Sequence, residues 1–135
     1  MKIIHLAYVV SDLEKSAAFY EDVLGFTRVG PRTPGSYPGM GYDLTDGELH
    51  LSLLQPNDTV ERVAWSHGVD GPNHFGAVVD DMDEVERKLA TYGIKAYAHQ
   101  YKGGDKANGA TYFKFQDLDG AEVDVSAKPW EISYA

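Results

Sequence analysis

Two histidines at equivalent points of an internal repeat are the residues best suited to chemistry. His5 lies in IHLAYVVSDLEK, residues 4–15, and His74 lies in the similar stretch NHFGAVVDDMDE, residues 73–84. Taken alone, each histidine is more simply a structural residue of a strand, but the repetition favours a shared role. Neutral imidazoles and ionised carboxylates bind Fe, Zn, Ni, Co or Mn. A divalent-metal site containing His5 and His74, of unspecified metal, is therefore predicted.

Carboxylates near the end of each copy supply further donors. The stretch FQDLDGAEVDVS offers Glu122 and Asp124, and DGELHLSLL offers Glu48, His50 and Ser52. Residues two apart share one face of a strand, so each group projects together. His50, Glu48 and Glu122 are candidates for proton transfer. The alternative is structural: Glu122 and Asp124 would form a solvated edge, and Glu48 and His50 would flank a turn. We favour this structural interpretation for Glu48 and Glu122.

The elements that position these residues also repeat. Residues 2–10 are rich in apolar and β-branched side chains, which predicts a strand. Ser11 to Glu14 then form a capping-box pattern, and an apolar stripe predicts a helix that ends at Gly25. The second copy predicts a strand over 74–79 and a helix that begins near Asp81 and ends at Gly93.

Three short strands are predicted after each helix. In the first copy they lie near 26–30, 40–45 and 48–55, and in the second near 94–100, 110–116 and 121–127. Asp46-Gly47 and Asp119-Gly120 predict the hairpin turns. We therefore expect an α+β fold of two βαβββ modules that pair their sheets around a shared cavity. Residues 1–135 would form a single domain with repeats 1–56 and 72–128 joined by linker 57–71.

Composition excludes several classes of protein. The formal net charge is -9, with 12 Lys plus Arg against 21 Asp plus Glu, which disfavours nucleic acid as a partner. The chain has no cysteine, so disulfides, thiolate metal sites and thiol nucleophiles are excluded. The apolar run at the N-terminus is too short to span a membrane. We expect a cytoplasmic protein with no membrane partner.

The doubled pattern, the histidine opening each copy, SDLEKSAAFYEDVLGF and DLDGAEVDV together resemble the vicinal oxygen chelate superfamily. This superfamily includes glyoxalase I, extradiol dioxygenases, methylmalonyl-CoA epimerase, fosfomycin resistance enzymes and bleomycin resistance proteins. The resemblance implies metal ligands at His5 and His74. It places the closing carboxylate ligand at Asp124, four residues after Gly120. The first-copy ligand falls on His50 or Ser52, and His50 is the better ligand chemically.

The resemblance implies a divalent-metal-dependent enzyme that acts on a small substrate through two neighbouring oxygens. Glyoxalase I has glutamate as the final ligand in both copies, whereas two histidines with one carboxylate fit extradiol dioxygenases and fosfomycin-modifying members. A glyoxalase-like lyase or isomerase and a dioxygenase therefore both remain open. Weaker acid–base candidates are Tyr112, Lys114 and His99.

Two other functions are consistent with the same sequence. The main alternative is a metal-free small-molecule binding protein of the bleomycin-resistance type, with an acidic and aromatic groove. Trp65 and Trp130 are expected to pack, although either could line such a pocket. A minority possibility is a family member that serves only as a subunit. The resemblance also favours a homodimer.

Overall fold

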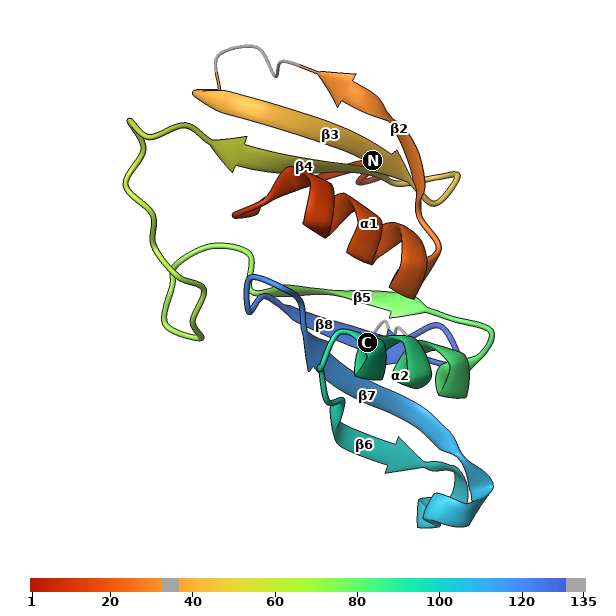
Figure 1. The fold of residues 1–135 in the computed structure, drawn as a ribbon. Coiled ribbons are helices and arrows are strands. Elements are labelled where there is room, and N and C mark those ends of the chain that lie inside the picture. Colours follow the sequence, from red (N-terminus) through yellow and green to blue (C-terminus); the bar gives the residue numbers. More distant parts are fainter. Residues whose placement is uncertain (33–36, 131–135) are drawn as a thin grey trace. The chain divides into compact units, whose positions relative to one another are not determined.

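The chain forms two compact units in a computed structural model that describes residues 1–32 and 37–130. The first unit spans Met1–Ala64 and the second Trp65–Ala135, here called the first and second modules. Their boundary falls inside the predicted linker 57–71. Each module has one α-helix and one four-stranded sheet (Figure 1).

The first module places its helix against one face of its sheet. Its elements are β1 (His5–Val9), α1 (Leu13–Leu24), β2 (Thr27–Arg32), β3 (Gly39–Thr45) and β4 (His50–Pro56). The strand order is β1-β4-β3-β2, with β1 parallel to β4 and the other pairs antiparallel. Phe19 of α1 and Leu44, Leu51 and Leu53 of the sheet are fully buried, so these side chains form the core. The alternate residues of β4 therefore project from the opposite face.

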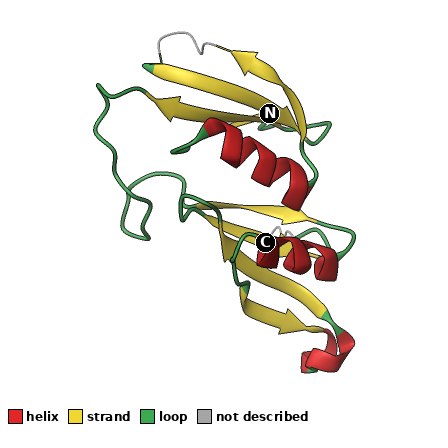
Figure 2. Cartoon of the chain, viewed as in Figure 1, coloured by secondary structure: helices red, strands yellow, loops and turns green. Residues whose placement is uncertain are grey.

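The second module repeats this arrangement. Its elements are β5 (His74–Val78), α2 (Met82–Thr91), β6 (Tyr97–Tyr101), β7 (Ala110–Gln116) and β8 (Glu122–Ser126). Short 3-10 turns at Lys102–Gly104 and Lys106–Asn108 join β6 to β7, and the strand order is β5-β8-β7-β6 (Figure 2). Leu89 of α2 and Phe113, Phe115, Val123 and Val125 of the sheet are fully buried. The α+β class and the two βαβββ modules are confirmed, and the shared cavity stays a prediction.

Polar side chains fix the starts of both helices. Asp12 is the N-cap of α1, and its carboxylate accepts a hydrogen bond from the Lys15 amide at 3.0 Å. Asp81 caps α2 in the same way, 2.9 Å from the Glu84 amide. The predicted capping box with Ser11 as its first residue is therefore wrong by one position. Strand pairing explains the shift, because the Val10 amide still bonds to Leu54 and the helix begins only after it.

Several strand boundaries differ from the predicted ones. β1 begins at His5 rather than at residue 2, and β6 begins at Tyr97 rather than at residue 94. The register of β6 against β7 shifts between Tyr97 and Gln100, and Ala98 in between has φ 55°. Both hairpin turns are confirmed, since Gly47 and Gly120 have positive φ between antiparallel strands. Neither helix is long and apolar enough to cross a membrane within the described residues.

Candidate functional site

A polar cluster lies on the sheet face of the first module opposite α1. His5 and His50 are direct neighbours in the parallel pairing of β1 with β4. Their Nδ1 atoms are 3.2 Å apart and their ring centroids 4.7 Å apart. The spacing suits a hydrogen bond in which one ring carries its proton on Nδ1, and it equally suits two ligands of one ion. The predicted residues His5 and His50 are therefore in contact.

Asp43 of β3 orients His50. Its Oδ1 atom lies 3.0 Å from His50 Nε2 and accepts a hydrogen bond of 2.8 Å from the Ser52 hydroxyl. A carboxylate on one imidazole nitrogen fixes the ring and leaves the other nitrogen for a ligand. His50 Nδ1 is thus directed toward His5. Asp43 was not predicted from the sequence, because its role depends on the pairing of β3 with β4.

The strand register answers whether His50 or Ser52 is equivalent to Asp124. Ser52 is paired with Ala7 in β1, and Asp124 is paired with Gly76 in β5. Ser52 is therefore the structural equivalent of Asp124, and His50 is the equivalent of Glu122. Ser52 is nevertheless 1% exposed and bonded to Asp43, whereas His50 contacts His5.

Glu48 lies in the turn before β4. Its side chain is 80% exposed and its Oε2 atom lies 3.4 Å from Lys2 Nζ. Glu48 therefore belongs to an exposed ion pair, as the alternative interpretation of a turn residue expects.

The second module has a cluster at the equivalent place. His74 Nε2 lies 3.4 Å from Asp124 Oδ2, and His74 Nδ1 lies 3.7 Å from Glu122 Oε2. Asn73 Oδ1 is 2.7 Å from the same Nδ1. Glu122 and Asp124 are 4% and 7% exposed. The interpretation of these two carboxylates as a solvated edge is therefore wrong, because β8 is flanked by strands on both sides.

Lys114 of β7 approaches the same two carboxylates from their other side. Its Nζ atom lies 3.1 Å from Asp124 Oδ1 and 3.4 Å from Glu122 Oε1. Burial by itself lowers the pKa of the Lys114 ammonium, but close contact with Asp124 and attraction to both carboxylates raise that pKa overall. Lys114 therefore stays charged and leaves Oδ2 and Oε2 on the His74 side.

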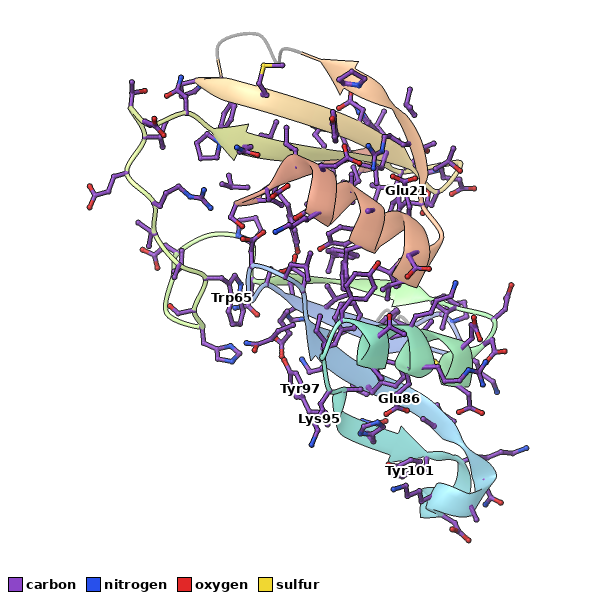
Figure 3. All side chains as sticks on the ribbon, in the orientation of Figure 1. Glu21, Trp65, Glu86, Lys95, Tyr97 and Tyr101 are labelled. Carbon is purple, nitrogen blue, oxygen red and sulfur yellow. The ribbon has the colours of Figure 1, made fainter. Side chains whose placement is uncertain are left out.

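Two tyrosines complete this cluster. The Tyr97 hydroxyl donates to Glu122 Oε1 at 3.0 Å, and Figure 3 labels Tyr97 on β6. Burial, aided by this hydrogen bond, raises the pKa of Tyr97 to about 12. Burial also raises the pKa of Tyr112, and a hydrogen bond to Asp124 adds to the rise. Both phenols therefore remain protonated donors at neutral pH.

His99 lies apart from this cluster. Its Nε2 atom is 2.7 Å from Oε1 of Glu86, which extends from α2 in Figure 3. The His99 ring also stacks on Tyr101 at a centroid distance of 5.6 Å. His99 therefore lies on the helix side of its sheet and joins α2 to β6.

The donor pairs of both modules suit a divalent ion in type and spacing. Two ligands bound at about 2.1 Å to one tetrahedral ion are roughly 3.4 Å apart. The separations of 3.2 Å for His5 with His50 and 3.4 Å for His74 with Asp124 match this value. Asp124 Oδ1, which has no hydrogen-bond partner of good geometry, is the oxygen in ionic contact with Lys114, so Oδ2 is the one available to an ion beside His74. Within residues 1–32 and 37–130, no three such side chains meet the geometry of a complete metal site.

The sequence matches the Glyoxalase/Bleomycin resistance protein/Dioxygenase superfamily over residues 2–125. The chain belongs to this family, which confirms the resemblance to vicinal oxygen chelate proteins.

Individual relatives are distant. The chain is 25% identical to methylmalonyl-CoA epimerase of Homo sapiens over 125 residues, which is 90% of this chain and 70% of the relative. It is 26% identical to glutathione transferase FosA of Serratia marcescens over 122 residues, 90% of this chain and 77% of the relative. A glyoxylase/bleomycin resistance protein/dioxygenase domain from Frankia sp. EAN1pec superposes with a TM-score of 0.75 at 18% identity, covering 93% of this chain and 96% of that one. The glyoxalase-like fold is therefore shown.

Proposed function

We propose that the protein is a divalent-metal-dependent enzyme of the vicinal oxygen chelate type. Its substrate is a small molecule that presents two neighbouring oxygens. The observation that supports this proposal is that each opening histidine has a ligand-like contact with the strand beside it: His5 with His50 of β4, and His74 with Asp124 of β8, two residues beyond the register equivalent of His50. When bound, the ion supplies Lewis acidity that stabilises negative charge on a substrate oxygen.

In this proposal the metal ligands are His5 and His50 of the first module and His74 and Asp124 of the second. Asp43 keeps His50 in its ligand orientation, and Lys114 holds one oxygen of Asp124 so that the other remains directed toward His74. Imidazole and carboxylate ligands of this kind suit Fe, Zn, Ni, Co or Mn.

Glu122 is the proposed proton-transfer residue. Its Oε1 atom is held by Tyr97 and Lys114, whereas Oε2 lies on the His74 side. A carboxylate held in this way accepts a proton from the carbon next to a substrate oxygen and returns it. Glu48 lacks such an environment because it is exposed and paired with Lys2. This supports a lyase or isomerase reaction more strongly than a dioxygenase reaction.

Metal analysis tests the proposal. We expect protein purified without a histidine tag to retain close to one transition metal ion per site. His5→Ala and His74→Ala each should lose that metal, as measured by elemental analysis. His67→Ala is the matched control, because His67 stacks edge-on against Trp65 and lies outside both clusters.

The opposite result has a definite meaning. Wild-type protein that holds no metal, and whose thermal stability is unchanged by a chelator, would contradict the enzyme proposal.

The second candidate function is a metal-free protein that binds a small molecule. The observation that favours it is Lys114, which already neutralises part of the Glu122 and Asp124 charge without an ion. Elemental analysis separates the two candidates directly. A homodimer and a cytoplasmic location remain predictions under either candidate.

A further inference from the structure

The second module contains a groove of about 630 Å³, within the usual range for small-molecule sites. Its lining combines aromatic, amide, hydroxyl and ammonium groups, including Gln100, Thr111, Tyr112, Ser126, Lys128 and Trp130. All of these residues belong to the second module.

Trp130 lies on the same sheet face as the His74 cluster. Its indole ring packs over Gly76 so closely that a Cβ atom on residue 76 would lie 2.5 Å from Trp130 Cη2. Gly76 is two residues from His74 in β5 and is paired with Asp124 in β8. Trp130 is still 47% exposed and lines the groove, so part of this residue remains available to a ligand.

Tyr112 connects the groove to the polar cluster. It lines the groove and pairs with Ser126 of β8, two residues from Asp124 on the same face of that strand. Burial raises the pKa of Tyr112, and the nearby Asp124 carboxylate adds to the rise. A molecule in the groove is therefore next to the side chain that carries the proposed carboxylate ligand.

Lys128 gives the groove a cation in a chain of net charge -9. The segment that carries it is tied back to the sheet, because the Ser126 hydroxyl donates to the Lys128 carbonyl at 2.7 Å and accepts from the Lys128 amide at 3.3 Å. The backbone of Lys128 is thus fixed beside the aromatic surface. Flat rings stack on Trp and Tyr faces, and an ammonium attracts an anionic substituent.

We propose that this groove binds a flat aromatic or conjugated group that carries an anionic substituent. Trp130 and Tyr112 contact the flat group, and Lys128 attracts the anion. Under the proposed function, on which this assignment rests, that group is the part of the substrate beyond the two metal-chelating oxygens.

The test uses three probes and the full chain in EDTA: 2-naphthoate, neutral 2-naphthamide and the non-planar anion cyclohexanecarboxylate. Calorimetry gives affinities, and NMR follows the indole N–H signals of the two tryptophans. We expect 2-naphthoate to bind more tightly than either other probe and to shift the Trp130 signal more than the Trp65 signal.

Substitutions assign the contacts. Trp130→Ala should weaken 2-naphthoate binding about tenfold. Lys128→Gln should weaken it about threefold without affecting 2-naphthamide. Lys102→Gln, an exposed lysine of the same module outside the groove lining, should leave both affinities unchanged. If Trp130→Ala fails to fold, the affinity of Lys128→Gln and the NMR shifts of the wild-type protein decide whether the groove binds 2-naphthoate.

Binding that survives both substitutions, shifts confined to Trp65, or equal affinity for cyclohexanecarboxylate would overturn the inference. Because the probes are tested in EDTA, a failure of this inference can be told apart from a failure of the proposed metal-dependent function. Probe binding by a protein that retains no metal supports the groove and contradicts the metal enzyme. A protein that retains metal but does not bind the probe would support the metal enzyme and contradict the groove proposal.

Discussion

Lys114 is the cation between two carboxylates that are almost completely buried. The Glu122 and Asp124 side chains are 5% and 9% exposed, so their mutual repulsion is poorly screened by water. Lys114 itself is 23% exposed and contacts one oxygen of each. Lys114 therefore supplies positive charge to both carboxylates, and His74 approaches them from the other side.

Lys114→Met should destabilise the metal-free protein by about 3 kcal/mol, since it leaves buried negative charge uncompensated. Urea unfolding in EDTA measures this change. Lys95→Met is the matched control, because Lys95 is an exposed lysine of the same module (Figure 3). Equal effects of the two substitutions would show that Lys114 does not stabilise the carboxylates.

The raised pKa of Tyr97 predicts that the stability of the protein depends on pH in the alkaline range. Its folded-state pKa is raised to about 12, whereas an unfolded tyrosine titrates near about 10. A raised folded pKa stabilises the protein below the unfolded value, and that contribution disappears as the pH rises through the folded value. Urea midpoints for wild type should therefore exceed those of Tyr97→Phe at pH 9, and the difference should shrink toward pH 12. A constant difference over this interval would contradict the assignment.

At the residue scale, the sequence predicted donor types better than their partners. Imidazole and carboxylate groups can bind a metal in whatever strand they occur, which is why the sequence alone suggested His5, His50, His74 and Asp124. The internal repeat drew attention to His5 and His74. Asp43 and Lys114 obtain their roles from sheet register, which places Asp43 beside Ser52 and Lys114 beside Asp124. Register between strands is set by long-range pairing, so sequence spacing alone does not reveal these partners.

At the scale of elements, the starts of the helices offer a direct test. Asp12 has an extended backbone, with φ -143° and ψ 107°, and caps α1 with its side chain. Asp12→Ala should destabilise the protein by about 1 kcal/mol. Ser11→Ala, at the position predicted from the capping-box pattern, should have a smaller effect. Urea unfolding of both variants measures the difference, and a larger effect at Ser11 would contradict the assigned cap.

Regular elements were predictable and irregular ones were not. Both helices follow apolar stripes that bury Phe19 and Tyr20 in α1 and Val85 and Leu89 in α2. The hairpins follow Asp-Gly pairs with their expected turn chemistry. β6 differs because the left-handed backbone of Ala98 shifts its register against β7, and no residue type in this stretch signals that conformation.

At the scale of the whole molecule, the repeat and its closing motifs were enough to predict the family. They did not predict a reaction, because one fold supports several chemistries. The two modules share topology yet differ in polar side chains at matching places. Asp43 and Lys114 both lie beside the equivalent positions Ser52 and Asp124, and they have opposite charge.

This opposition means that the two halves of the gene are no longer interchangeable. A lysine at position 43, as in the second half, would place an ammonium beside the His50 imidazole. Copying the first half's aspartate codon into the second would add a third carboxylate to two that water barely reaches. An exchange of these two residues between the halves would therefore leave each cluster with an unfavourable charge.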